Sequence, residues 1–393
     1  MIKKIHLTLG LALAFVACVE VEESIGTLVH EDGPRGAWEG PLQQDTRAVA
    51  LVGRDEAGAI AVVRVDDGEV VTRFASAELT GLTDVSAAFD ADGALSHLAL
   101  LSHDEEDQFG VLGFASASEG GFGPRIEGAE YQGQTRVLAL PEGALVMQDD
   151  IGQRWSFARL GETTYASTTC PMPASIFGLR TDSGSLKVRA FAWDADEHPT
   201  LVEGSLLGGK WHCQLGTITT EGPLSRSARV ALVKGIGPVV VDATKAHMRV
   251  ATLSDVELGP FRASAFYGER IEHVEPWALE DSAGLVVLAT NPTAVSVLSL
   301  REEADSRLTI VEQATVLLPA VTESTWFSRE LVVTKDRVFV ATSSGLIGFE
   351  LGLSPTLGLH PLELPQSLRA LRGPLVALPA LPSHMAGSGP END

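Results

Sequence analysis

The amino-acid sequence predicts an all-β protein and, more specifically, a β-propeller. Apolar segments rich in Val, Leu and Ala alternate with turns that contain Gly or Asp, which is typical of short antiparallel strands. One hairpin unit recurs along most of the chain, as expected for a repeat architecture. Almost no stretch shows the sustained 3.6-residue period of an amphipathic helix. Together these observations favour a fold built from many small sheets.

The recurring unit is an apolar strand, a tight turn and a second, more apolar strand. Glycine in these turns supplies the positive φ angle that a tight hairpin needs. Successive second strands begin at intervals of about 35 to 53 residues, which brackets the ~40 to 50 residues of a propeller blade. Seven copies begin at Arg47, Asp84, Thr135, Ala174, Ala228, His273 and Arg329.

A third alternating strand follows several of these hairpins, and a looser fourth segment follows some of them. The third strands begin at Phe109, Arg154, Val295 and Leu346, and a fourth segment begins at Leu308. Four short strands per unit fit a propeller blade better than a β-sandwich. A pair of β-sandwich domains remains the alternative, because such domains also have short strands and Gly or Asp turns.

The two ends of the repeat region predict how the ring closes. Residues 367–381 resemble the first two strands of one more blade, and residues 25–32 and 36–40 are candidates for its missing strands. Joining both ends in one blade removes open sheet edges, which otherwise promote aggregation. The sequence therefore favours eight four-stranded blades with a split closing blade, and seven blades is the near alternative. We expect the propeller to span residues 25–382, with a flexible tail at 383–393.

Composition limits the partners of the protein. The 393-residue chain is 45% hydrophobic and 21% charged, which is typical of a folded protein. Its formal net charge is −23 at pH 7. A surface this acidic repels phosphate backbones, so we expect no nucleic-acid partner. The charge itself is explained by a well-solvated exterior.

The N-terminus predicts export. Lys3 and Lys4 precede an apolar segment at residues 5–16, which is too short to span a bilayer as a stable helix but long enough for the core of a signal peptide. The segment ends in Phe15-Val16-Ala17-Cys18. An ordinary signal peptide cut near Ala17 and a buried helix are the alternatives.

The segment that ends in Cys18 resembles the bacterial lipobox, in which small residues precede a cysteine. The resemblance implies that residues 1–17 are removed, that Cys18 receives a diacylglycerol, and that its new amine is acylated with palmitate or a similar chain. Two or more acyl chains give stable anchoring, because each buried CH2 contributes ~0.8 kcal/mol. Residues 18–24 then form an acidic tether. In this family, Val19 rather than Asp after the cysteine implies transport to the outer membrane or cell surface.

The remaining cysteines predict a disulfide between Cys170 and Cys213. Exported proteins meet oxidising conditions and rarely keep exposed free thiols. Two separate buried thiols are the alternative. No motif surrounds either residue, so a catalytic thiol is not expected.

The sequence contains no convincing motif for a metal, a cofactor or catalysis. The loop at residues 102–107 is acidic, but a solvated hairpin tip explains it better than a cation site. Residues 90–93 begin like a calcium loop, yet Leu101 stands where a bidentate Glu is required. The histidines lack zinc-ligand spacing, and neither a GxSxG elbow nor a phosphate-binding loop occurs. We therefore predict no catalytic residue, no metal and no cofactor. The histidines considered are His97, His103, His198, His212 and His247.

Three functional hypotheses remain, of which the third is a sugar- or peptide-binding module. The first is a non-enzymatic binding or scaffold lipoprotein with an envelope protein or glycan as its partner and the membrane contacted through lipid. In plan and length the chain resembles the propeller lipoprotein of the outer-membrane β-barrel assembly machine. The second is an envelope glycan hydrolase or lyase, whose acids would gather at one end of the ring. Its candidate residues end the second strands, although caps of turns explain them more simply. They are Asp149, Asp150, Asp194, Asp242 and Asn291.

Overall fold

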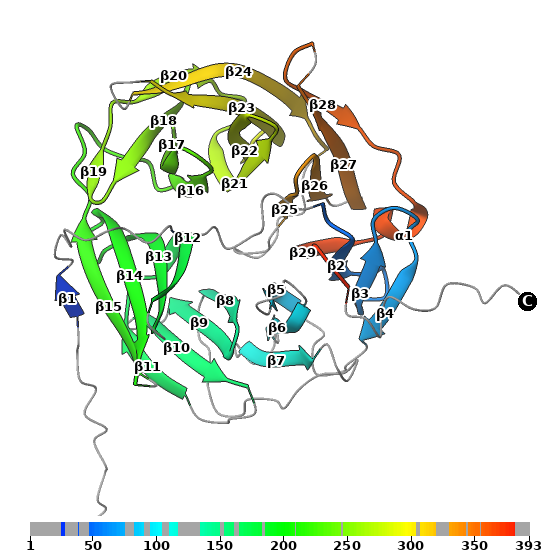
Figure 1. The fold of residues 1–393 in the computed structure, drawn as a ribbon, viewed down its shortest axis with the longest axis horizontal. Helices are drawn as coiled ribbons and strands as arrows, with labels where there is room; N and C mark the ends of the chain where they lie inside the picture. The colour runs from blue at the N-terminus through cyan, green and yellow to red at the C-terminus, as the bar shows by residue number, and fades with distance from the viewer. Residues whose placement is uncertain are drawn as a thin grey trace, which may run out of the picture.

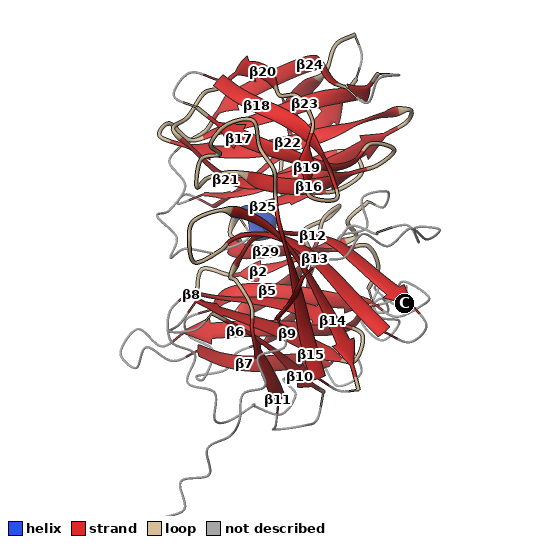
Figure 2. Cartoon of the chain, turned by 90° about the vertical axis from the view of Figure 1, so that its left-hand side faces the viewer, coloured by secondary structure: helices blue, strands red, loops and turns tan. Residues whose placement is uncertain are grey.

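A computed structural model shows a closed ring of seven β-sheets, which confirms the predicted propeller (Figure 1). In side view, the chain is almost entirely strand (Figure 2). The only helix of the described part is α1 (Gln366–Arg369). No helix among these residues is long and apolar enough to cross a membrane. The structure describes residues 25–27, 38, 47–74, 82–89, 95–103, 110–116, 134–149, 153–160, 165–182, 185–208, 210–244, 247–303, 307–319, 330–342, 345–353 and 355–381.

The first three blades are built from residues 50–169 and the last strand of the chain. Each is an antiparallel sheet, and all paired strands are sequence neighbours except the last strand of the chain and its partner. From the inside outward, blade 1 is β29 (Arg372–Leu378), β2 (Ala50–Arg54), β3 (Ile60–Arg64) and β4 (Val70–Phe74); blade 2 is β5 (Leu82–Phe89), β6 (Leu95–His103) and β7 (Gly110–Ser116); blade 3 is β8 (Gln134–Leu140), β9 (Gly143–Asp149), β10 (Arg154–Arg159) and β11 (Tyr165–Thr169).

Blades 4 and 5 each have a fifth strand at the outside. In blade 5 the extra strand β20 pairs with β18, beside β19. Blade 4 is β12 (Pro173–Asp182), β13 (Ser185–Trp193), β14 (Pro199–Leu207), β15 (Lys210–Thr217) and β1 (Ile25–Thr27); blade 5 is β16 (Arg229–Val233), β17 (Gly237–Ala243), β18 (His247–Ser254), β19 (Glu257–Leu258) and β20 (Arg262–Ala265).

Blades 6 and 7 complete the circle and bring the chain back to blade 1. Both are simple four-stranded meanders. Blade 6 is β21 (Arg270–Leu279), β22 (Ser282–Thr290), β23 (Ala294–Glu302) and β24 (Leu308–Leu317); blade 7 is β25 (Leu331–Val333), β26 (Arg337–Thr342), β27 (Gly345–Gly352) and β28 (Gly358–Pro361).

The ring closes through β29, which pairs antiparallel with β2. Ala50 lies opposite Leu378, and Val52 lies opposite Val376. The C-terminal strand is therefore the innermost strand of the blade that the N-terminal part of the chain builds. A split closing blade is confirmed.

The preference for eight blades was wrong, and seven is correct. The first hairpin copy, which begins at Arg47, forms the second and third strands of its blade, whereas the other copies form the first and second. Residues 367–381 supply its missing first strand and do not begin a new blade. Only residues 367–369 of that segment lie in α1, where Leu368 is fully buried, and β29 is its one strand in a sheet.

The N-terminal segment expected in the closing blade lies elsewhere. β1 adds to the outer edge of blade 4, parallel to β15, with Ile25 opposite Cys213. Trp38, from the second candidate segment, packs its ring under the guanidinium groups of Arg180 and Arg189 in the same blade, with Arg189 Cζ 4.3 Å from the ring centroid. The other residues of 36–40, the predicted leader, tether and tail, and Cys18 lie outside the described residues.

The hydrophobic core is divided among the blade interfaces. The described residues form seven hydrophobic clusters, and each cluster joins two neighbouring blades. In β2, Leu51 packs toward blade 7 while its neighbour Val52 packs toward blade 2. Successive strand residues point to opposite faces, so both faces of this sheet are buried. This explains why many strands are continuous apolar runs and do not alternate with polar residues.

The structure places Cys170 and Cys213 with their Cα atoms 6.1 Å apart, which is within the range that a disulfide requires. Cys170 follows β11 in blade 3, and Cys213 lies in β15 of blade 4. Both cysteines are buried in the cluster that joins these blades, beside Trp155 and Trp211. The bond would therefore connect the outer strands of two neighbouring blades.

We expect reduction of this disulfide to destabilise the protein by about 2–4 kcal/mol, because it closes a long loop in the unfolded chain. Urea unfolding of the Cys18→Ser variant, with and without reductant, measures the change. The Cys170→Ser/Cys213→Ser double variant on the same background is the control and should not respond to reductant. Two titratable thiols in the unreduced, unfolded Cys18→Ser chain would contradict the pairing.

Candidate functional site

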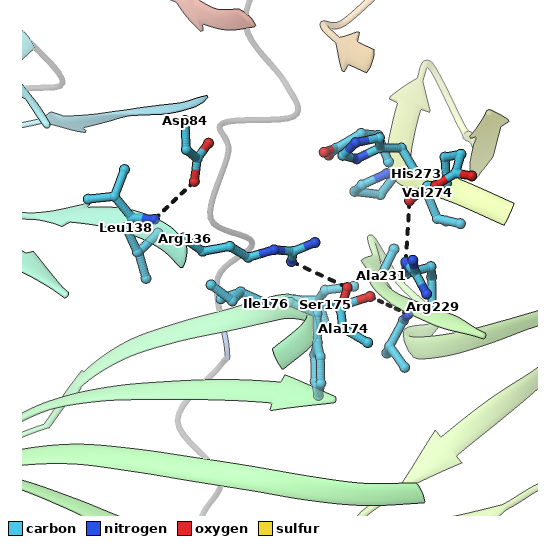
Figure 3. Close-up of a pocket in the computed structure, with 17 residues that line it drawn as sticks. Asp84, Arg136, Leu138, Ala174, Ser175, Ile176, Arg229, Ala231, His273 and Val274 are labelled. Carbon is cyan, nitrogen blue, oxygen red and sulfur yellow. Dashed lines mark hydrogen bonds between the residues drawn. The ribbon is translucent and has the colours of Figure 1, made fainter. Parts of the chain in front are cut away.

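The central channel contains a cavity of about 100 Å³, lined by the innermost strands of five blades (Figure 3). Its walls consist of backbone, small and branched apolar side chains, and a set of charged or polar groups. The first strand of each blade faces the axis, and the lining residues of the cavity lie on or next to such strands. The polar lining residues are Asp84, Arg136, Ser175, Arg229, Glu272, His273 and Glu275.

Asp84 connects blade 2 to blade 3. Its side chain lies on β5 and the residue is only 2% exposed. One carboxylate oxygen accepts a hydrogen bond from the backbone N–H of Val85 at 2.9 Å, and the other accepts one from the N–H of Val137 on β8, also at 2.9 Å. Both oxygens are thus satisfied by backbone donors, as a buried carboxylate requires.

Three further polar side chains cross the next interfaces in the same manner (Figure 3). Arg136 on β8 donates from Nη1 to the carbonyl oxygen of Ala174 on β12 at 3.3 Å. Ser175 Oγ on β12 accepts from the N–H of Val230 on β16 at 3.0 Å.

Arg229 on β16 continues the series by donating from Nε to the carbonyl oxygen of Glu272 on β21 at 3.3 Å. Its Nη1 also donates to the carbonyl oxygens of Arg226 and Ala228. Burial lowers the pKa of Arg229 to about 10, with nearby Glu272 opposing and Arg270 adding to the shift. The guanidinium therefore stays protonated at neutral pH and keeps all of these bonds.

These contacts form a repeated inter-blade bond. Acceptor and donor side chains alternate from blade 2 to blade 6, and each bonds the backbone of the next innermost strand. Such bonds are directional, so they fix the height of one blade relative to the next in a way that apolar packing does not. The polar groups of the channel are thus part of the framework.

The cavity is small for a ligand site. Pockets that bind drug-sized ligands usually measure about 300–1,000 Å³. A space of about 100 Å³ with polar and apolar walls has room for several water molecules. This part of the channel can hold water or a small hydrated solute.

The acids that the sequence suggested for a hydrolase have local roles. Asp194 lies in the turn after β13, where its Oδ1 accepts from the N–H groups of Asp196 and His198. Asp242 is fully buried and accepts from Ser225 and Arg249, with Arg249 Nε at 2.8 Å. Asn291 occupies a turn with φ of 58°. None of the three lines the cavity. The side chain of Asp149 and all of Asp150 lie outside the described residues.

His97 is buried at the interface of blades 2 and 3. Its Nε2 lies 2.9 Å from the carbonyl oxygen of Gly143, so this nitrogen carries the proton and donates. The ring edge packs against Phe114. Burial lowers the pKa of His97, and the hydrogen bond to Gly143 partly offsets this decrease. Across the residues that the structure describes, no group of three His, Cys, Asp or Glu side chains gathers as a metal site.

The sequence analysis missed the inter-blade residues, although a signal for them exists. In five of the first strands, a polar residue directly precedes a β-branched apolar residue. These pairs are Asp84-Val85, Arg136-Val137, Ser175-Ile176, Arg229-Val230 and His273-Val274. An aligned comparison of the seven copies, position by position, would have revealed this repeat.

Comparison with known proteins supports no family. No family model and no curated protein matches the sequence. TolB from Acinetobacter baumannii aligns at 12% identity and a TM-score of 0.37, over 83% of this chain and 65% of TolB. A protein from Lactobacillus plantarum aligns at 10% identity and a TM-score of 0.43, over 83% of this chain and 98% of that protein. Apo AztD from Citrobacter koseri aligns at 11% identity and a TM-score of 0.43, over 83% of this chain and 97% of AztD. Likenesses this weak carry no argument about function, and the chain is assigned only as a seven-bladed propeller.

We expect Asp84→Asn to lower the free energy of unfolding by about 1–3 kcal/mol, because the new amide nitrogen cannot accept and leaves a buried N–H unsatisfied. Asp194→Asn is the matched control, since Asp194 uses one oxygen for both of its backbone bonds and Asn keeps that oxygen. Urea unfolding of the two variants measures the difference. Equal stabilities would contradict the role of Asp84 between blades 2 and 3.

The lowered pKa of His97 predicts loss of stability in mild acid. The unfolded chain binds more protons than the folded one below about pH 6.5, the ordinary value for His. The contribution of His97 is therefore complete above that pH and decreases as the pH falls below it. The difference in unfolding free energy between wild type and His97→Gln should shrink on acidification. Parallel pH curves for wild type and His97→Gln would contradict this assignment.

Proposed function

We propose that the protein is an exported lipoprotein that acts as a non-enzymatic binding scaffold at the cell envelope. The observation that carries this proposal is the bonding of the channel: four of the polar side chains that line its cavity of about 100 Å³ bond the backbone of the neighbouring blade. In a propeller of this kind, the surfaces available to a large partner are the two faces and the rim. A rigid disc with loops on its faces suits that role.

Export and lipidation are supported by the N-terminal sequence and by the cysteine geometry. The segment that ends in Cys18 has the pattern of a lipobox. The close approach of Cys170 and Cys213 fits a chain that folds in an oxidising compartment. We accordingly propose that the mature protein is held at the outer membrane or cell surface by acyl chains on Cys18.

The partner is proposed to be an envelope protein or glycan. The strongly acidic surface, with a net charge of −23, argues against nucleic acid. The alternative of a glycan hydrolase or lyase gains nothing from the described acids, because Asp194 and Asp242 are occupied in local hydrogen bonds. No specific observation favours that activity.

The anchor is tested by Cys18→Ser. We expect the wild-type chain to incorporate an alkyne-labelled palmitate in a bacterial host and to sediment with membranes. The variant should incorporate none and leave the membrane fraction. The Cys170→Ser/Cys213→Ser variant is the control for a general effect of cysteine loss and should still be labelled. An intact leader with unmodified Cys18 in the mass spectrum of the wild-type protein would refute the anchor.

The scaffold role is tested by crosslinking the native lipoprotein in membranes and purifying it. We expect a defined envelope partner to be recovered with the wild-type protein. Recovery of no stable partner, together with turnover of an envelope glycan by the purified protein, would replace the scaffold with the enzyme.

A further inference from the structure

Arg229 brings a positive charge to the wall of the channel cavity, and all of its hydrogen-bond acceptors are neutral. Its Nε donates to the carbonyl oxygen of Glu272, and its Nη1 donates to the carbonyl oxygens of Arg226 and Ala228. Among the described residues, no carboxylate lies within ion-pair distance of this guanidinium. The charge is therefore stabilised by backbone dipoles and not by a contacting counter-charge.

The acidic residues that line the cavity are committed to other groups. Asp84 accepts a backbone N–H on each of its carboxylate oxygens. Glu272 Oε1 accepts from the hydroxyl of Thr290 at 3.0 Å and lies 3.4 Å from Arg270 Nε. Glu275 also has a partner. Burying a cation without a contacting counter-charge is unfavourable, so an anion placed beside the Arg229 guanidinium would be stabilised.

The pKa of Arg229 reflects the same imbalance. Burial lowers this pKa to about 10, and the attraction of nearby Glu272 does not cancel the effect. The guanidinium is thus charged at neutral pH but less well solvated than an arginine in water. A bound anion would supply the stabilisation that burial removes.

Arg229 and Ser175 each retain a hydrogen-bond donor that the inter-blade bonds do not use. A guanidinium carries one N–H on Nε and two on each Nη nitrogen, so the bonds of Arg229 leave the hydrogens of Nη2. Ser175 Oγ accepts from the N–H of Val230, and no described group accepts its hydroxyl hydrogen. Both residues line the same cavity, from β12 of blade 4 and β16 of blade 5 (Figure 3).

The size and chemistry of the cavity suit a small oxyanion. Its volume of about 100 Å³ has room for several water molecules, and a phosphate or acetate ion would take the place of a few of them. Hydrogen bonds from a guanidinium to an anionic oxygen are stronger than those between neutral groups. The lining also includes Arg136, which adds a second positive charge to the wall.

We propose that the channel cavity is a binding site for a small oxyanion, held by Arg229 Nη2 and the hydroxyl of Ser175. The ligand class is a carboxylate, phosphate or sulfate group with few non-hydrogen atoms. This site goes beyond the scaffold role, because it gives the propeller a ligand inside the ring. Since Ser175 belongs to blade 4 and Arg229 to blade 5, the bound anion would also join these two blades.

Titration of the purified full-length protein in a zwitterionic buffer tests the site. Line broadening in the ³¹P spectrum of inorganic phosphate and in the ¹³C spectrum of labelled acetate reports binding of each anion. We expect saturable binding of at least one of them to wild type. Arg229→Gln should weaken it about tenfold or more, because it removes a charged donor, whereas Arg229→Lys should retain part of the affinity. Arg301→Gln, at an exposed site in blade 6, is the matched control and should bind as wild type does.

A wild-type crystal soaked in sodium selenate locates the anion without relying on a variant that must fold. We expect an anomalous selenium peak within hydrogen-bond distance of Arg229 Nη2. Selenium peaks only outside the channel, or equal affinities of wild type and folded Arg229→Gln, would overturn the proposal. The absence of saturable binding of both phosphate and acetate to the wild-type protein would overturn it as well.

Discussion

The pairing of β29 with β2 is the contact on which the rest of the structure depends. Both faces of a blade are apolar: in β2, Leu51 and Val52 are adjacent in sequence and belong to clusters on opposite sides of the sheet. An isolated blade would expose one or both of these faces to water. Only a closed ring gives every blade two neighbours, and the C-terminal strand closes it by completing the blade that the N-terminal half begins. Burial of apolar surface, the dominant favourable term in folding, is therefore distributed around the circle.

The polar residues of the channel add directional hydrogen bonds to the apolar packing between neighbouring blades. Asp84, Arg136, Ser175 and Arg229 each bond the backbone of the next innermost strand. Through these bonds the charged groups that line the channel stabilise the arrangement of the blades. Farther out, the Arg47 guanidinium and the Asp336 carboxylate join blade 1 to blade 7 at the closure. Arg337 and Asp66 form a second ion pair across that interface.

Much of the architecture could be predicted from the sequence because each blade repeats a local pattern. The seven hairpin copies correspond to seven blades, and the third strands expected at Arg154 and Val295 are present as β10 and β23. The number of blades could not be obtained in the same way, because ring closure is a long-range pairing. Nothing local distinguishes a strand that completes the first blade from one that begins an eighth. Residues 367–381 were expected to form two strands, but Gly373 and Pro374 lie inside the single strand β29.

The placement of β1 and the hydrogen bonds of the channel were harder to predict from the sequence, for two different reasons. β1 is a three-residue strand that pairs with β15, about 190 residues away in sequence. The periodicity of so short a strand does not indicate its partner. The channel residues are ordinary polar residues at the starts of strands, and each acquires its role only when the neighbouring blade is placed beside it. Asp194 and Asp242 illustrate the converse, since their positions at strand ends suggested convergence but local backbone and side-chain donors explain them.

Hydrogen exchange at the amides of β29 tests ring closure most directly. If β29 is the inner strand of blade 1, its ladder amides must exchange as slowly as those of β2 and must be released together with them as denaturant is added, because separating either strand opens the ring. Rapid exchange over residues 372–378 while the other blades stay protected would contradict a ring closed by this strand.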